Sequence, residues 1–154
     1  LRDNNEIFFK IIGFGTLENE IKEIIRNEKL KNIEFYGKKS KDELFEILSL
    51  CDTLYKGNPT KNLYKYGISS IKLVEYMILK KPILDASDGD DLVFNAKAGI
   101  SIQNENSLEL SKTILKMSKM DKTLLQKMGQ NGHDYVCENY MYVEIVSRML
   151  KQLI

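Results

Sequence analysis

Cysteine, histidine and long apolar stretches are all scarce in this sequence. The two cysteines, Cys51 and Cys137, lie far apart and neither belongs to a Cys-x-x-Cys pair, so neither a disulfide framework nor a thiolate metal site is expected. His133 is the only histidine, so a histidine triad or metal cluster would depend on it alone. We interpret His133 as a surface residue at a helix end, in a bend flanked by glycines.

Net charge is also nearly absent, because 23 Lys and Arg residues are balanced by 22 Asp and Glu residues. No general attraction to nucleic acid is therefore expected. No apolar run approaches the ~20 residues of a membrane-spanning helix, and the N-terminus lacks the layout of a signal peptide. These absences predict a soluble, cytoplasmic domain.

The 154 residues suffice for one domain, so we predict a single domain over residues 1–154. The chain opens Leu1-Arg2-Asp3 without a methionine and reaches its first strand almost at once. We expect it to be a fragment of a larger two-domain protein.

Strand and helix patterns alternate along the chain. Strands are predicted at 7–12, 32–36, 53–56, from 82 and at 99–102, and helices at 17–30, 40–50, from 69 or 70 to 80, and from 107 to the end with breaks near Asp121 and between Gly129 and Gly132. This order predicts an α/β fold, a Rossmann-like parallel sheet with helices on both faces and a helical C-terminal third.

Ligands of such folds lie outside the carboxyl ends of the strands. The candidate segments there are residues 13–16, 37–39, 56–70 and 85–91. The most informative of them leads into YGISSIKLVEYM, from Tyr66 to Met77. Lys72 falls in the first turn of the predicted helix, where the helix dipole disfavours a cation by roughly 0.3 to 1 kcal/mol unless an anion is near. The backbone N–H groups of that helix start suit a phosphate.

Glu75 follows Lys72 on the same side of the helix, among apolar neighbours. A carboxylate there needs hydrogen-bond donors, and a ribose diol offers two hydroxyls. A plain intrahelical pair between Lys72 and Glu75, without any ligand, explains the two charges equally well. The residues by themselves leave both interpretations open.

Four segments in register carry a resemblance to a known family. They are IIGFGTLENEIKEI, NIEFYGKKSKDELFEILSLCD, YGISSIKLVEYMILKKPIL and KMGQNGHDYVCENY. From Phe9 to the C-terminus the chain resembles the C-terminal, donor-binding domain of the retaining group 1 glycosyltransferases with a GT-B fold. The donor segment is most similar to the sugar transferases of capsule and O-antigen synthesis.

The resemblance implies a nucleotide-diphosphate sugar, UDP-linked by the subgroup similarity, as the donor substrate. Glu75 matches the acidic residue that holds the nucleotide ribose, and Ile71 and Lys72 match positions that line the diphosphate. Lys72 and the backbone of Ser69, Ser70 and Ile71 are the candidates for stabilising phosphate charge as the donor bond breaks. Lys72 and Glu75 are thus the predicted catalytic residues.

Two turns are also implied in donor binding. Gly37 and Lys38 match the loop whose backbone meets the base, and Gly13 and Gly15 match the turn that lets the chain pass close to the donor pocket. Many relatives carry a further glutamate that contacts the sugar, but Gly67 occupies the corresponding position here. We count Gly67 as a donor-site position whose contact with the sugar ring differs.

For the parent enzyme the resemblance implies a hexosyltransferase-type reaction in surface polysaccharide synthesis, with a glycan or lipid-linked acceptor. The acceptor-binding N-terminal domain would be the main partner, so the fragment alone should be inactive. No cofactor or metal is required, since the sequence offers no clustered ligand set. The lysine-rich segments 61–65 and 112–122 are compatible with peripheral contact to an anionic membrane and equally with solvated faces.

Two other classes remain as alternatives. An NAD-binding Rossmann domain would use Gly13-x-Gly15, but its third small residue should stand where Glu18 is found. A non-enzymatic, flavodoxin-like interaction domain would have the same fold and no affinity for nucleotide sugars.

Overall fold

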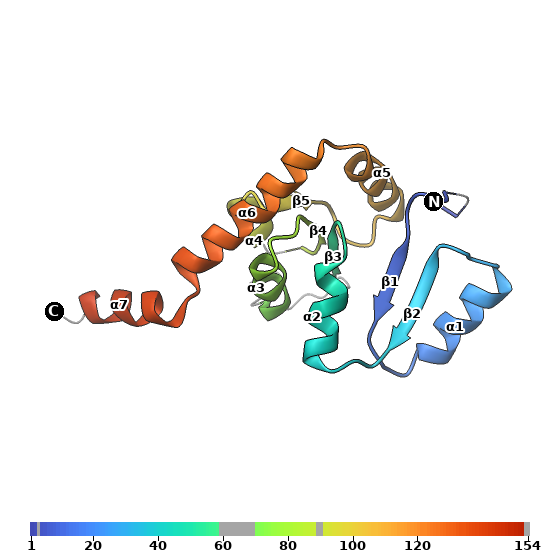
Figure 1. The fold of residues 1–154 in the computed structure, drawn as a ribbon, viewed down its shortest axis with the longest axis horizontal. Helices are drawn as coiled ribbons and strands as arrows, with labels where there is room; N and C mark the ends of the chain where they lie inside the picture. Colours follow the sequence, from blue (N-terminus) through green and yellow to red (C-terminus); the bar gives the residue numbers. More distant parts are fainter. Residues whose placement is uncertain (3, 59–69, 89–90, 153–154) are drawn as a thin grey trace. The chain divides into compact units, whose positions relative to one another are not determined.

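The protein is described by a computed structural model, which covers all residues except 3, 59–69, 89–90 and 153–154 (Figure 1). The chain divides into two compact units, residues 1–48 and 49–154. Each unit has its own parallel sheet, two-stranded in the first and three-stranded in the second.

The first unit is built on two parallel strands. β1 (Phe9–Ile12) pairs with β2 (Ile33–Gly37), and α1 (Glu18–Asn27) makes the crossover between them (Figure 1). Asn32 fixes the start of β2, because its side-chain amide donates to the carbonyl oxygens of Leu1 at 3.0 Å and Ile7 at 3.1 Å. The unit ends in α2 (Lys41–Ser49), which continues to the junction with the second unit.

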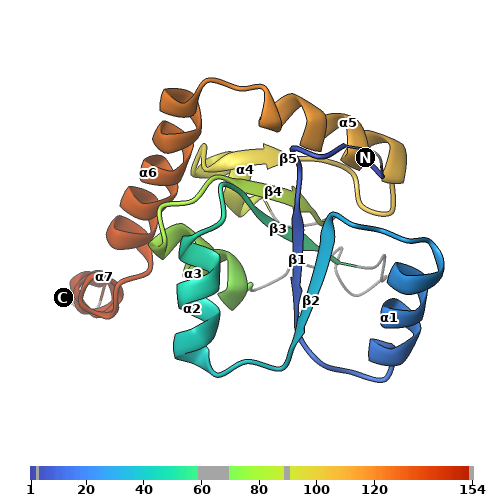
Figure 2. The same cartoon turned by 45° about the vertical axis from the view of Figure 1, so that its right-hand side comes forward.

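The second unit contains the strands β3 (Leu54–Gly57), β4 (Ile83–Ala86) and β5 (Gly99–Ser101), in that order and all parallel (Figure 2). The crossovers carry α3 (Ile71–Ile78) and α4 (Leu92–Asn95). The short helix α4 is absent from the sequence prediction, because its single turn is too short to show a helical period.

Both faces of this three-stranded sheet are covered. On one face Ile83 of β4 packs with Leu73 and Met77 of α3 and with Val136. On the other face Leu84 and Ala86 pack with Ile102 and Met117. Adjacent residues of β4 thus enter opposite cores, as a strand buried on both faces requires. The α/β class, the parallel pairing and the helices on both sides of the sheet are confirmed, with the strands distributed over two sheets.

Three helices form the C-terminal third: α5 (Ser107–Ser118), α6 (Lys122–Asn139) and α7 (Tyr142–Gln152). The predicted break near Asp121 is confirmed, since the Asp121 carboxylate caps α6 by accepting from the Thr123 N–H at 2.7 Å. The predicted break between Gly129 and Gly132 is wrong, because α6 runs through both. His133 therefore lies inside a helix, half-buried, and not at a helix end.

The two glycines of α6 serve packing instead. A Cβ atom on Gly129 would overlap the carbonyl oxygen of Lys80. A Cβ atom on Gly132 would come within 2.9 Å of the Ala98 side chain and 3.0 Å of Met77 Cγ. Glycine at these positions lets α6 approach the segments that follow α3 and precede β5, which is a tertiary requirement that local sequence patterns do not reveal.

Candidate functional site

The helix α3 of the second unit begins without a side-chain cap from its own N-cap residue. Ser70 occupies the N-cap position with extended backbone (φ −100°, ψ 93°), yet its side chain makes no capping hydrogen bond. The first turn contains no acidic residue, whereas α1, α2, α5 and α7 each have Asp or Glu in theirs. Ile71 is 73% exposed. The free backbone N–H groups at such a helix end point outward, where they can bind an anion.

The two predicted catalytic side chains project from this helix in different environments. Lys72 is exposed, and no ion pair of its ammonium is found within the described part of the chain. Glu75 is half-buried, on the same helix as the buried core residues Leu73 and Met77. Burial, and then the charge of Glu75, raise the pKa of the neighbouring Tyr76 above 10.0.

The predicted glycine turns lie in the first unit, at the carboxyl ends of β1 and β2. Gly13 and Gly37 both have positive φ, 155° and 68°, which favours glycine at these positions. The Gly13 N–H donates to the Gly37 carbonyl at 2.9 Å, so the two turns are joined. Apart from the adjacent residues of the chain, a Cβ atom on Gly13, Gly15 or Gly37 would meet no atom within 4 Å.

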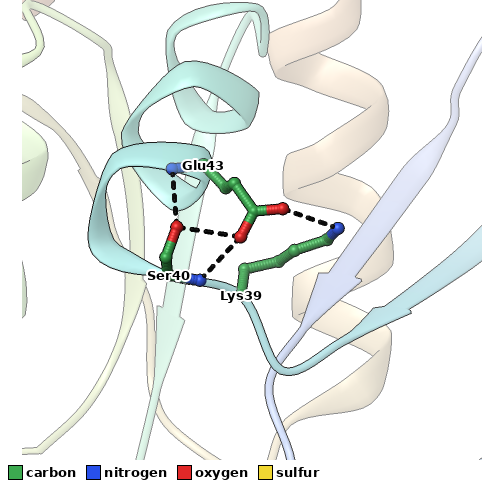
Figure 3. A network of polar contacts seen from close by, with 3 residues as sticks. All are labelled: Lys39, Ser40 and Glu43. Carbon is green, nitrogen blue, oxygen red and sulfur yellow. Dashed lines mark hydrogen bonds and ion pairs between the residues drawn. The ribbon is translucent and has the colours of Figure 1, made fainter.

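The loop that follows β2 ends in a complete capping box (Figure 3). The Ser40 hydroxyl accepts from the Glu43 N–H at 3.3 Å, and the Glu43 carboxylate accepts from the Ser40 N–H at 2.9 Å. Lys39 adds an ion pair to Glu43 at 3.2 Å. The Ser40 backbone N–H, then its hydroxyl and Lys39, lower the pKa of Glu43 from 4.5 to about 2. This helix start is therefore occupied by the protein's own negative charge.

A buried polar network lies at the carboxyl ends of β3 and β4, within the candidate segments 56–70 and 85–91, although no pairing of these side chains was predicted. Lys56 lies opposite Asp85 in the strand register; its ammonium donates to the Ser87 hydroxyl at 2.8 Å and is 3.6 Å from Asp85 Oδ1. The Ser87 hydroxyl donates to Asp85 at 2.6 Å. Lys56 and Asp85 are only 6% and 0% exposed. The available signal was the period of two that places Lys56 in phase with buried Leu54.

The predicted donor residues thus fall into two groups. Gly13, Gly15, Gly37 and Lys38 are brought together in the first unit, and Ser70, Ile71, Lys72 and Glu75 in the second. Gly67 and Ser69 lie outside the described residues. The role of each residue stays a prediction.

The described residues form neither a metal-ligand cluster nor a membrane-spanning helix. No group of three or more His, Cys, Asp and Glu side chains there is arranged to hold a metal ion. Nor does any helix in the same part of the chain have the length and apolarity needed to cross a bilayer.

Comparison with known proteins identifies relatives of this chain. Residues 1–135 match the model of the family "Glycosyl transferases group 1". An uncharacterized glycosyltransferase of Methanocaldococcus jannaschii is 26% identical over 129 residues, which cover 82% of this chain and 35% of the relative.

Solved structures show the same fold. S. aureus TarM, in a mutant form crystallised with fondaparinux, alpha-GlcNAc-glycerol and UDP, superposes with a TM-score of 0.78 at 20% identity, over 96% of this chain and 29% of TarM. Sucrose-phosphate synthase from Thermosynechococcus elongatus gives a TM-score of 0.69 at 16% identity, over 94% of this chain and 38% of the synthase. The fold is thus similar to that of GT-B enzymes, and the chain spans about a third of the length of these relatives.

The family match covers most of the chain, including both glycine turns of the first unit and the whole of α3. The chain belongs to the group 1 glycosyl transferases.

Proposed function

We propose that this chain binds the nucleotide-diphosphate sugar donor of a glycosyltransferase, and that the donor is a UDP-sugar. The observation that carries the proposal is the start of α3, where the N-cap residue Ser70 makes no side-chain capping hydrogen bond and Lys72 adds a cation, in a segment that the family match covers. An anion there would offset the unfavourable position of a cation at a helix N-terminus. The diphosphate of the donor supplies that anion.

Glu75 is assigned to the ribose. The half-buried Glu75 lies one turn further along α3, and its carboxylate can accept hydrogen bonds from the two hydroxyls of a diol. UDP is bound by the TarM structure with the same fold, and this supports UDP over other nucleotides. Gly67, in place of a glutamate, makes the contact with the sugar ring differ from that of many relatives.

For the whole protein we propose transfer of a hexosyl group with retention, to a glycan or lipid-linked acceptor in surface polysaccharide synthesis. The chemistry needs stabilisation of phosphate charge as the donor bond breaks, and a helix N-terminus with a lysine provides it without reorganisation. A separate N-terminal domain would bind the acceptor. The family membership favours this enzyme class over an NAD-binding domain or an interaction module.

Binding of uridine and UDP to the chain tests the two assignments separately. Glu75→Ala should lower the affinity for both ligands by about tenfold or more, since a hydrogen bond to a charged group contributes roughly 1.5 to 3 kcal/mol. Lys72→Ala should lower the affinity for UDP and leave the affinity for uridine unchanged, because uridine has no diphosphate. Isothermal titration calorimetry measures the dissociation constants of both ligands.

Two exposed helical residues provide matched controls. Glu23→Ala on α1 and Lys112→Ala on α5 remove the same charges elsewhere and should leave both affinities unchanged. If Glu75→Ala and the unaltered chain bind UDP with equal affinity, the assignment of Glu75 to the ribose is wrong. If the unaltered chain does not bind UDP, the proposed donor is wrong.

A further inference from the structure

A small pocket lies within the second unit, at the end of the sheet where ligands of parallel folds bind. Its lining comes from the ends of β3 and β4, the turn after β5 and the start of α5, and includes Tyr55, Ala86, Gln103, Glu105, Ser107 and Leu110. The pocket has a volume of about 170 Å³, and cavities of about 150 Å³ hold a benzene ring. One six-membered ring therefore fits. Among the described residues, none of α3 lines this pocket.

Tyr55 supplies an aromatic wall of the pocket. It lies opposite Leu84 in the parallel register of β3 and β4, so its side chain is on the same face of the sheet as that core residue. A Cβ atom on Gly57 would overlap the Tyr55 hydroxyl, so the side chain extends along β3 over this glycine. Tyr55 is 52% exposed. With Ala86 and Leu110 it forms the apolar part of the lining.

The rest of the lining is polar. Gln103 and Glu105 belong to the turn between β5 and α5, Ser107 is the first residue of α5, and all three are exposed. Their amide, carboxylate and hydroxyl groups can both donate to and accept from the hydroxyls of a ligand. Asn106 also lines the pocket, but it caps α5 by accepting from the Glu109 N–H at 3.0 Å. This helix start therefore already has its own side-chain cap.

The charge of the pocket favours an uncharged ligand. Among the described residues that line it, Glu105 is the only one with a charged side chain, and none is Lys, Arg or His. An anionic ligand would be repelled by this carboxylate without a cation to offset it. A pyranose ring meets the remaining requirements, because it has an apolar C–H face and a rim of hydroxyls. Small-molecule sites combine apolar and aromatic walls with a few polar groups in this way.

We propose that this pocket binds one uncharged pyranose residue of a glycan, with its C–H face on the Tyr55 ring and its hydroxyls hydrogen-bonded to Gln103, Glu105 and Ser107. The inference goes beyond the proposed function, because the ligand carries no nucleotide and none of these residues is assigned to the donor. It gives the second unit a saccharide site that is separate from the start of α3.

NMR titration of the ¹⁵N-labelled chain with the methyl glycosides of glucose, galactose and mannose tests the proposal. A methyl glycoside carries its anomeric oxygen in the linkage that a glycan has. At least one of the three should bind with a dissociation constant in about the millimolar range and shift the amide signals of the lining residues. Tyr55→Ala should lower this affinity by about tenfold, whereas Tyr55→Phe keeps the ring and should retain most of it.

The charge of the ligand is tested with the methyl uronide of the sugar that binds best, which has the same ring and a carboxylate. The unaltered chain should bind the uronide about fivefold more weakly than the neutral glycoside, as expected for two like charges near a protein surface. Glu105→Gln removes the repelling charge and should reduce this ratio. A uronide that binds as tightly as the neutral glycoside would overturn the assignment of an uncharged ligand.

Tyr142→Ala is the matched control, because Tyr142 is an exposed tyrosine (80%) on α7. It should leave glycoside binding unchanged, and circular dichroism checks that each variant folds. The proposal is wrong if none of the three glycosides gives saturable shifts of the lining residues, or if Tyr55→Ala binds as tightly as the unaltered chain. Glycoside binding without UDP binding would refute the proposed donor alone, and UDP binding without glycoside binding would refute this inference alone.

Discussion

At the scale of single residues, the capping box of α2 links charge to local structure. Glu43 is exposed, yet the pKa of its carboxyl is lowered to about 2 by the Ser40 N–H, the Ser40 hydroxyl and Lys39. A lowered pKa in the folded state means that the ionised form is favoured by folding. Glu43 therefore contributes stability above the unfolded pKa of 4.5, and this contribution is lost as the pH falls toward 2.

We expect the stability difference between the unaltered chain and Glu43→Ala to be greatest above pH 5 and to shrink as the pH falls to about 2. Urea unfolding at several pH values measures it. Glu43→Gln keeps an acceptor for the Ser40 N–H but has no titration, so its own contribution should not vary over this range. If the free energies of unfolding of the unaltered chain and Glu43→Ala differ by the same amount at pH 6 and pH 2.5, the carboxylate charge does not have this role.

At the scale of elements, α6 is a helix in which packing against another segment of the chain requires a glycine. Gly129 is unfavourable in a helix interior, by roughly 1 kcal/mol relative to alanine. It is buried, and the carbonyl of Lys80 occupies the space that a side chain would need. The close approach of α6 to the end of α3 therefore outweighs local propensity.

Gly129→Ala should destabilise the protein by about 1 to 3 kcal/mol despite its better helix propensity, because backbone atoms must move to admit the methyl group. Gln126→Ala, at an exposed position of the same helix, should be neutral within about 0.5 kcal/mol. Urea unfolding of both variants makes the comparison. Stabilisation by Gly129→Ala would show that helix propensity, and not packing, governs this site.

At the scale of the whole molecule, the buried apolar residues are concentrated in one of the two units. All residues of both hydrophobic clusters lie between Leu54 and Val136, in the second unit. In the described part of the first unit only the polar residue Asn32 is buried. The second unit also has three strands covered on both faces, which suffice for independent stability, whereas a two-stranded sheet does not.

We therefore expect residues 49–154 to fold in isolation and residues 1–48 not to do so. Far-UV circular dichroism and a cooperative urea transition identify folding in each fragment. Both fragments should be compared with the full chain under the same conditions. A non-cooperative transition for 49–154, or a cooperative one for 1–48, would contradict this distribution of stability.

The sequence by itself determined the features that depend on neighbouring residues. The periods of two and 3.6 located the five strands and most helices. The spacing of Ser40 and Glu43 is that of a capping box, which the structure contains. The order and spacing of four segments also led to the family, which the family match confirms. Each of these features is a spacing between residues that are close in sequence, or an order of such spacings along the chain.

Only the tertiary structure decided what depends on residues distant in sequence. Lys56 is an ordinary polar residue until β4 brings Asp85 and Ser87 against it and buries all three. Phe14 gains its partner Lys38 only when β1 and β2 pair. Gly129 and Gly132 predict a helix break from the sequence, and only the nearby Lys80 carbonyl and Ala98 side chain explain them as packing positions within α6. Contacts of this kind are formed by the packing of whole elements, so no local pattern specifies them.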